Sequence, residues 1–483
     1  MPIDAGRAAI FPASPSAPGR ATMDGPMAQA PFWGLLLLLA WAPLPFASNR
    51  PWSWSLLSLA VGVLLVLWAI AFARRPHLLR LSWRRMLVPA APFGLALAWA
   101  FLQTTAMLPA AWHDPLWGQA GTALGHPLAG AISSDPAGSA GGAMRLMAYA
   151  GIFWLATQYG RDPRYARRIV RCVVLAGIGY AAYGLAVFAS GNRTILWFGR
   201  WAYDGDLSST FVSRAAFGAY AALALLCALA LLFRTVERAA ARDREGRRLP
   251  VHLIETLPAA FYGLVAGCMT LATAMMLTHS RGAVAVAAIG IAVMLAALFL
   301  RKRQGRRHVI AAALCIAVAG VALLDMSGRV TLGRVLSLAD QGTGREAIHA
   351  LAERAIEAAP LAGHGLDTFG DAYFRYRDMA IPWDSPRYDK AHSPYLELAM
   401  ELGLVGFSFF MAALAVILVA IAAGVARRRR GMHYPILGLA ATALLAAHSW
   451  PDFSIQMPAV AATYAALLGV AFAQSWSGRA ANR

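Results

Sequence analysis

The sequence of 483 residues is 59% hydrophobic and only 14% charged, whereas soluble domains are about 45–50% apolar and about 25% charged. Its formal net charge at pH 7 is +19, from 43 Lys and Arg against 24 Asp and Glu. Taken alone, that charge would indicate a nucleic-acid-binding protein. However, so apolar a chain cannot bury its hydrophobic residues in one or two soluble cores. The composition therefore excludes a nucleic-acid partner and predicts a polytopic all-α membrane protein.

Twelve apolar segments approach the length of about 20 residues that a membrane-spanning helix needs. The predicted spans are 31–47, 51–73, 86–108, 143–160, 169–190, 212–233, 257–279, 282–300, 309–325, 395–425, 434–450 and 455–476. The stretch 257–300 is almost unbroken except for Ser280, Arg281 and Gly282, which we interpret as the tip of a hairpin.

The same reading divides the chain into five parts. Residues 1–30 are rich in Pro, Ala and Gly and are predicted to be a disordered tail. Spans one to nine occupy residues 31–325, and spans ten to twelve occupy residues 395–476. Between them lies a long loop at 326–394, and residues 477–483 form a second tail.

Positive charge predicts the orientation, because Lys and Arg are enriched in the cytoplasmic loops of membrane proteins. Runs of basic residues lie in every second connection, at 74–85, 161–171, 234–248, 301–307 and 427–430. The intervening connections hold most of the acidic residues. Both termini are therefore predicted to be cytoplasmic, and the loop at 326–394 is predicted to be external.

No cofactor or metal is predicted. The four cysteines lie in or beside apolar spans without a CxxC pair, and the histidines form no HxxxH or HExxH pattern. Asp204 and Asp206 bracket a glycine, but a single DGD in a loop is weak evidence for a metal site.

Three arginines at the predicted outer boundary are candidates for binding a phosphate. Arg281 lies in the tip, Arg214 opens span six and Arg145 opens span four. An ionisable residue at membrane depth costs about 2.5–3.5 kcal/mol on insertion scales and so indicates function. A planar guanidinium matches phosphate oxygens, although each arginine could instead anchor the helix to lipid headgroups.

A second group of candidate residues surrounds the start of span ten. His392 precedes Pro394, which favours a helix start, and Glu397 and Glu401 follow on one helix face. A histidine titrates near neutral pH and can take a proton from an attacking hydroxyl. His448 and Asp452, between spans eleven and twelve, either support such a site or cap a tight turn.

The segment 344–358 has the spacing of an amphipathic helix. Two interpretations remain open for it. The helix lies on the membrane surface where a lipid substrate enters, or it packs on the helical bundle.

At this point the residues resemble a family, the bacterial O-antigen ligase and polymerase superfamily. His392-Ser393, nine residues and then Gly403-Leu404-Val405-Gly406 fit the ligase signature H-[NSQ]-x9-G-x-x-[GTY]. The stretch 344–369 resembles the family's loop helix and P-x-x-G-x-G-x-x-x-F segment. HSRGA at 279–283 and SSTFVSRAAFGAY at 208–220 resemble its S-R-G and T-F-x-N-x-N-x-F elements. Ser213 and Ala215 replace the usual asparagines.

The resemblance implies a GT-C-like fold in the bacterial inner membrane. It also implies a metal-independent, inverting transfer of a glycan from undecaprenyl diphosphate to lipid A-core or another acceptor on the periplasmic side. By position, His392 matches the essential loop histidine, and Arg281 and Arg214 match arginines thought to bind the donor diphosphate.

Other functions fit the same sequence. A polymerase would join repeat units to one another, and a protein O-oligosaccharyltransferase would use a protein acceptor. A transporter also commonly has twelve spans with both ends inside. Transporters tend, however, to have paired halves and polar residues at the membrane midplane, whereas the ionisable residues here gather at the outer boundary.

Overall fold

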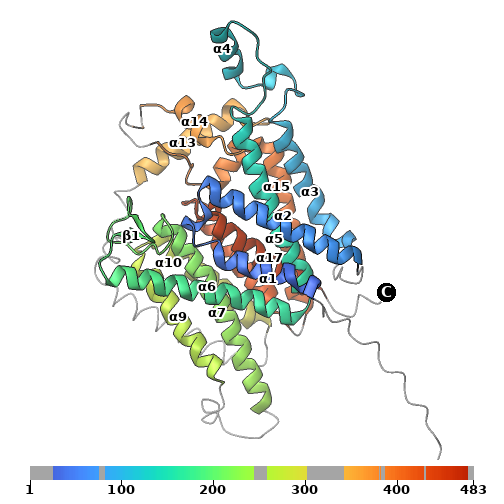
Figure 1. Ribbon diagram of the computed structural model, residues 1–483, viewed down its shortest axis with the longest axis vertical. Coiled ribbons are helices and arrows are strands. Elements are labelled where there is room, and N and C mark those ends of the chain that lie inside the picture. Colours follow the sequence, from blue (N-terminus) through green and yellow to red (C-terminus); the bar gives the residue numbers. More distant parts are fainter. Residues whose placement is uncertain are drawn as a thin grey trace, which may run out of the picture.

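The computed structural model describes residues 26–74, 82–243, 258–301, 342–379, 381, 387–428 and 431–476. These residues are almost entirely helical (Figure 1). Their only sheet is one antiparallel pair, in which β1 (Thr194–Ile195) aligns with β2 (Phe198–Gly199). The predicted all-α polytopic class is confirmed.

Seven described helices are long and apolar enough to cross a membrane. They are α2 (Pro51–Arg74), α3 (Trp83–Leu102), α6 (Pro163–Ala189), α7 (Arg214–Asp243), α9 (Ala259–Leu277), α10 (Arg281–Arg301) and α15 (Pro394–Arg427). Four other predicted spans coincide with α1 (Pro26–Trp41), α5 (Pro136–Gly160), α16 (His433–His448) and α17 (Pro458–Gln474). The span predicted at 309–325, the loop residues 326–341 and most of both predicted tails lie outside the described residues.

The centre of the bundle is formed by α7 and α17, which are apolar and buried on nearly all sides. A helix that is hydrophobic all round belongs in a core. Helix α17 packs closely on α5, since a Cβ on Gly469 would lie only 2.6 Å from the Phe153 carbonyl oxygen. The Thr157 hydroxyl donates to the Gly469 carbonyl across the same contact. Small residues here allow the two backbones to approach, as is usual between membrane helices.

The outward faces of the peripheral helices remain apolar. On α2, Leu59, Val63 and Val66 are 64%, 50% and 58% exposed. Contiguous exposed apolar surface of this kind indicates a membrane or protein contact, and the lengths of the helices fit a lipid environment.

The predicted hairpin tip is a turn at residues 278–280, directly before α10 begins at Arg281. The two flanking helices do not form an isolated hairpin. Helix α9 packs mainly on α7 and α6, whereas α10 packs mainly on α16 and α7. The turn therefore brings the start of α10 to the end of α16.

Helix α15 is broken at Gly403, whose φ of 62° and ψ of 171° are not helical. Glycine is required there, because its φ lies in the left-handed region and a Cβ would lie 2.2 Å from the Leu361 carbonyl oxygen. The segment 360–365 crosses the break, with a hydrogen bond from the Leu404 amide to the Pro360 carbonyl. The signature glycine thus forms the contact with the P-x-x-G-x-G segment.

The break frees helical carbonyl groups, and side chains from α3 satisfy them. Trp99 Nε1 donates to the Leu402 carbonyl over 2.7 Å. Gln103 Nε2 donates to the Glu401 carbonyl over 2.9 Å and to the Ala362 carbonyl over 2.7 Å. An interrupted membrane helix is tolerated only when other protein groups pair its backbone in this way.

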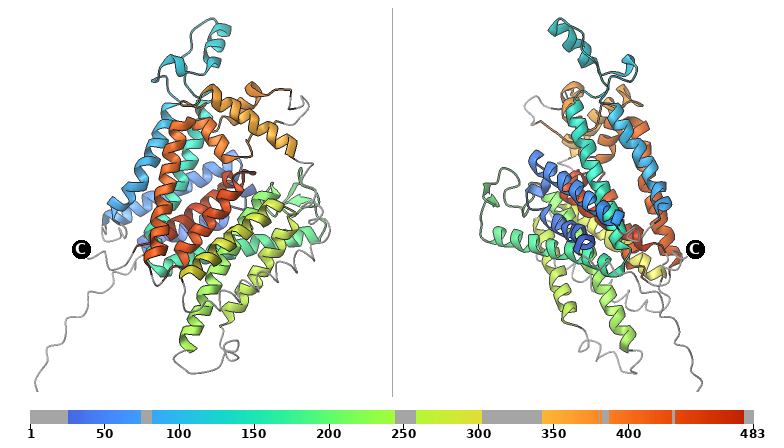
Figure 2. Two further views of the ribbon diagram at one scale, coloured as in Figure 1. Left: turned by 180° about the vertical axis from the view of Figure 1, so that it is seen from behind. Right: turned by 45° about the vertical axis from the view of Figure 1, so that its right-hand side comes forward.

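The long loop folds into two helices above the bundle (Figures 1 and 2), α13 (Gly342–Ala358) and α14 (Phe369–Tyr376). The apolar face of α13 is buried against α14 and α15 through Ile348, Leu351, Ala355 and their neighbours. The structure thus shows 344–358 as a helix whose apolar face packs on the bundle.

The segment between α3 and α5 also forms a lobe. The α4 lobe, residues 109–135, contains the 3-10 turn η3 (Ala110–Trp112) and α4 (Pro115–Leu124). All three ribbon views show α4 projecting beyond the ends of the bundle helices (Figures 1 and 2).

Candidate functional site

His392 lies two residues before α15, where Pro394 occupies the first turn as predicted. Its φ of 56° is a left-handed conformation, which histidine adopts more readily than most residues. The half-buried ring stands edge-on between Tyr388 and Phe453, with centroid distances of 5.8 and 4.9 Å. Its Nδ1 atom is buried and has no hydrogen-bond partner among the described residues. The backbone and two aromatic rings therefore hold a histidine with one unused ring nitrogen.

Burial lowers the pKa of His392 below its ordinary value, and the nearby Asp452 carboxylate partly opposes this shift. The imidazole is accordingly neutral at neutral pH and can accept a proton. Arg345 and His349, in the first turns of α13, also act electrostatically on the ring. The first turns of the loop helix α13 therefore lie near His392.

The turn between α16 and α17 joins His392 to the remaining predicted residues. Phe453 contacts His392, and Asp452 Oδ1 accepts a hydrogen bond from the Ser454 amide over 2.8 Å. His448 Nε2 lies 3.9 Å from the same Asp452 oxygen and 3.3 Å from the Ser454 hydroxyl. Both interpretations of His448 and Asp452 are thus compatible with the structure, since they shape the turn and also adjoin His392.

The starts of two other helices meet at His448. The backbone of Ala215, in the first turn of α7, lies beside its ring. A Cβ on Gly282, in the first turn of α10, would lie 3.4 Å from its Cε1. Since Arg214 and Arg281 are the first residues of these helices, two positive helix ends lie beside one buried imidazole. Helix N-termini favour bound anions.

Asp206 orients the two polar groups of this region. Its Oδ2 forms an ion pair with Arg214 Nη1 at 2.5 Å, and its Oδ1 lies 2.7 Å from His279 Nδ1. The carboxylate is buried, and Arg214 lies under the Tyr203 ring at 5.4 Å. The aspartate of the DGD loop thus fixes an arginine and the histidine of the HSRGA tip.

Arg145 belongs to a different group of charges. It pairs with Asp367 at 2.6 Å and stands over the Trp54 ring at 5.1 Å. Lys390 Nζ lies 3.2 Å from Asp367 and 3.1 Å from Glu397. The structure therefore brings Arg145 together with Glu397 rather than with Arg214 and Arg281.

The role of Glu397 is clear from its contacts. Its side chain is 1% exposed, and besides the Lys390 contact it accepts a hydrogen bond from the Ala391 amide over 2.8 Å. Burial alone would lower the pKa of Lys390, but Glu397, Asp367 and Glu401 outweigh it and raise the pKa. A charged lysine is thus held beside Glu397, and the pair fixes the chain immediately before His392.

These charges lie at one end of a cavity of about 430 Å³ between α3, α5, α15, α16 and α17. Its remaining lining is mainly apolar, with Phe93, Leu146 and Leu414 as examples. Glu401 is 3% exposed, and its Oε1 has no hydrogen-bond partner among the described residues. The turn at 449–457 adjoins both the cavity and His392, since its Ser449 and Gln456 line the cavity and its Phe453 contacts His392.

Sequence reasoning missed three contributors to this region: Lys390, Asp367 and Gln103. One signal was available for Lys390, since it is one of two lysines in a chain whose other basic residues are arginine. Asp367 and Gln103 gave none, because their importance arises from partners more than 200 residues away in the sequence.

Within the described residues, no group of three or more His, Cys, Asp or Glu is placed to hold a metal ion. The titratable groups instead form small clusters of carboxylates with basic residues, such as Asp206 with Arg214 and His279, and Lys390 with Asp367 and Glu397.

Residues 266–411 match the family model described as O-antigen ligase. The matched region contains the turn with Arg281, the helix α13, the segment 360–365, His392 and the break in α15. A search of the curated proteins found no match.

Proposed function

The chain is a multi-pass membrane protein with an O-antigen ligase domain of the O-antigen ligase and polymerase superfamily, and from this premise we propose its reaction. It transfers a glycan from undecaprenyl diphosphate to lipid A-core or a similar acceptor. The reaction takes place on the periplasmic side of the bacterial inner membrane, with both termini of the chain in the cytoplasm. The observation that supports the proposal is that His392 and the starts of the two helices that begin at Arg214 and Arg281 lie around the turn at 448–454.

In the proposed reaction the acceptor hydroxyl attacks the anomeric carbon of the lipid-linked glycan. A new glycosidic bond forms, and the bond between this carbon and the diphosphate oxygen breaks. The diphosphate leaves with the electron pair, and the hydroxyl proton passes to His392. Attack opposite the leaving group inverts the anomeric configuration.

The arginines have an electrostatic role in this step. Negative charge develops on the diphosphate as its bond to the sugar breaks, and fixed cations in a site of low polarity stabilise such charge. Arg214 is already oriented by Asp206, so little reorganisation is needed. The starts of α7 and α10 add their backbone dipoles to the same position. These charges support a metal-independent mechanism.

His392 has the properties of a base in this scheme. Its Nδ1 has no hydrogen-bond partner among the described residues, and its lowered pKa keeps the imidazole neutral at neutral pH. The charged residues around the start of α15 have supporting roles. Glu397 and Lys390 fix the chain before His392, and Glu401 and Arg145 line the adjoining cavity.

A deletion strain tests the proposal and separates ligase from polymerase. Loss of a ligase leaves lipopolysaccharide with a bare core while carrier-linked polymer accumulates. Loss of a polymerase instead leaves core bearing a single repeat. If the deletion strain keeps a normal lipopolysaccharide ladder on gels without complementation, the proposed acceptor is contradicted.

A further inference from the structure

A second cavity, of about 840 Å³, lies outside the predicted spans between the α4 lobe and the segment 358–376. This volume is within the range of about 300–1,000 Å³ that small-molecule sites occupy. The two walls are held together by an ion pair in which Arg375 binds both oxygens of Asp114 at 2.6 Å. Asp114 also caps α4 through the Leu116 amide. The cavity is thus a built feature, because its walls are joined by a bidentate pair.

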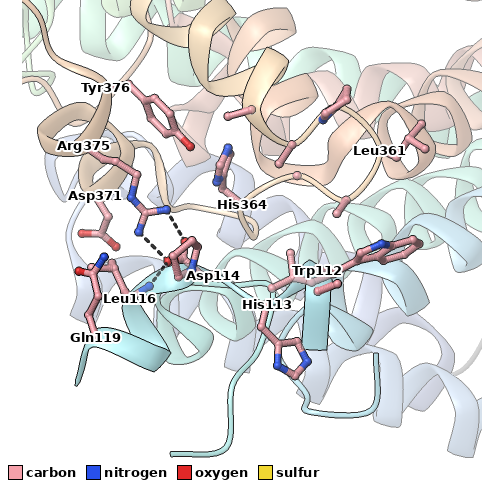
Figure 3. Close-up of a pocket in the computed structure, with 18 of the residues that line it drawn as sticks. Trp112, His113, Asp114, Leu116, Gln119, Leu361, His364, Asp371, Arg375 and Tyr376 are labelled. Atoms are coloured by element: carbon pink, nitrogen blue, oxygen red, sulfur yellow. Dashed lines mark hydrogen bonds and ion pairs between the residues drawn. The ribbon is translucent and has the colours of Figure 1, made fainter. Parts of the chain in front are cut away.

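The lining of this cavity has two ends of different chemistry (Figure 3). One end is polar and presents Asp371, Gln119 and Tyr376 beside the ion pair. The other end presents Trp112 and Leu361. Trp112 is 45% exposed, so part of its indole remains available to a ligand.

We propose that this cavity binds the sugar chain of a substrate, several sugar units away from the sugar that reacts. A pyranose ring has an apolar face of C–H groups, which packs on an aromatic ring, and a rim of hydroxyls, which pairs with planar polar side chains. An aromatic end and a polar end in one cavity offer both contacts. The inference rests on the proposed glycan transfer and specifies a new part of its substrate recognition.

The charges of the cavity favour a neutral ligand. Asp114 and Arg375 compensate each other, which leaves Asp371 as a net negative group. Burial lowers the pKa of His364, so its imidazole adds no positive charge at neutral pH. A diphosphate would be repelled here, whereas a hydrocarbon chain would leave the polar end without partners. A hydroxylated, uncharged chain is neither repelled by the negative charge nor leaves the polar end without partners.

The cavity lies at a suitable distance from the reacting groups. The first turns of α13 act on His392, and its last residue, Ala358, lines the cavity. From His349 to Ala358 the helix rises about 14 Å, which an oligosaccharide of a few sugars spans. A glycan running along α13 would therefore have one sugar at His392 and later ones in the cavity.

The cavity is also coupled to the break in α15. Residues 360–364 line it on one side and cross the break at Gly403 on the other. Trp112 stands edge-on to Trp99 at 6.4 Å, and Trp99 donates to the Leu402 carbonyl. The P-x-x-G-x-G segment thus forms the wall between the proposed sugar site and the helix that begins beside His392.

Binding is tested with the full-length protein in detergent micelles. The probe is a set of oligosaccharides that mild acid releases from the carrier-linked glycan of the source cells. These oligosaccharides carry neither lipid nor diphosphate. Calorimetry should show binding of chains with several repeats, and Trp112→Ala should weaken it about ten-fold. Gln119→Ala should weaken it by a smaller factor. Trp83→Ala is the matched control, since Trp83 is also exposed but lies at the other end of α3.

Unfolding temperatures of the variants equal to that of the wild type would establish that the lobe is folded. The inference is overturned if the wild type binds no oligosaccharide, or if folded Trp112→Ala binds as tightly as the wild type. Competition by lipid dispersions without sugar would also overturn it, because it would assign the cavity to a hydrocarbon chain.

A transfer assay separates this inference from the proposed function. One arm combines a donor of several repeats with a short acceptor, and the other combines a single-repeat donor with a long acceptor. Trp112→Ala should lower kcat/KM about ten-fold in the arm whose long glycan occupies the cavity, and less in the other. Oligosaccharide binding without any transfer would contradict the proposed function alone. Transfer that is equally sensitive to Trp112→Ala in both arms would contradict the sugar site alone.

Discussion

His392 is the residue on which the proposed chemistry depends most. Its ring is held by Tyr388 and Phe453, so removing the imidazole should affect catalysis more than folding. We expect His392→Ala to lower the transfer rate by at least about 100-fold, the usual contribution of a general base. The rate is measured with purified protein whose amount and unfolding temperature match the wild type. Retention of activity within a few-fold would contradict a base role.

The lowered pKa of His392 predicts the pH dependence. Only the neutral imidazole accepts a proton, so activity should be constant at neutral pH and fall as pH drops through a pKa below about 6.5. Asp452 raises this pKa, so Asp452→Asn should move the decline to lower pH. A decline centred above pH 7, or a shift in the opposite direction, would contradict the assigned environment.

Lys390 and Glu397 form a buried pair whose separate removal should be costly. Glu397 is 1% exposed, so Lys390→Met would leave a buried carboxylate without its cation and should destabilise the protein by about 3–5 kcal/mol. The double variant Lys390→Met with Glu397→Gln should recover part of this loss. Thermal unfolding in detergent measures both. A double variant less stable than Lys390→Met would show that the two residues do not act as a pair.

At the scale of single elements, the break in α15 determines where its first half points. Gly403→Ala would place a Cβ 2.2 Å from a backbone oxygen at a φ of 62°. Only a shift of the backbone could relieve this clash, because no flexible side chain is involved. We expect little folded protein. Gly62→Ala, in a helix position with nothing within 4 Å, should be neutral or stabilising by about 1 kcal/mol.

A milder variant tests the same element without removing its fold. Trp99→Phe deletes the hydrogen bond to the Leu402 carbonyl and should cost about 1–3 kcal/mol, because that carbonyl would lose a partner. The unfolding temperature reports the loss. An unchanged temperature for Gly403→Ala or for Trp99→Phe would contradict the account of the break.

Much of the element structure was predictable from the sequence, for physical reasons. Long apolar runs mark helices in lipid, and Pro394 and the spacing of 344–358 gave the start of α15 and the course of α13. The break at Gly403 was not predictable from local pattern, because α15 reads as one apolar helix. Its cause is the distant segment 360–365, which only the folded chain brings there.

The candidate site was predictable in part. His392, Arg214 and Arg281 were found because ionisable residues are rare in apolar surroundings, and their helix ends do meet around the turn at 448–454. Arg145 pairs with Asp367 in the structure, a neighbour that membrane level alone does not indicate. Its ion pair with Asp367 depends on the packing of α5 beside the long loop.

For the whole molecule, the distribution of basic residues predicts which ends face the cytoplasm. Cysteine introduced at Gly118 in α4 should react with a membrane-impermeant maleimide in intact spheroplasts. Cysteine introduced at Arg164, in the first turn of α6, should react only after permeabilisation. The described native cysteines are buried or half-buried and provide the background. The reverse pattern would invert the topology and place His392 in the cytoplasm.

Transfer itself is the central claim, and one reconstitution tests it directly. Purified protein in liposomes is given a defined undecaprenyl-diphosphate-linked glycan and lipid A-core, and the acceptor is analysed by mass spectrometry. We predict an acceptor heavier by the mass of the glycan, release of undecaprenyl diphosphate, and loss of both with His392→Ala and with Arg281→Ala. An acceptor of unchanged mass beside intact donor, or equal product from His392→Ala, would contradict the account.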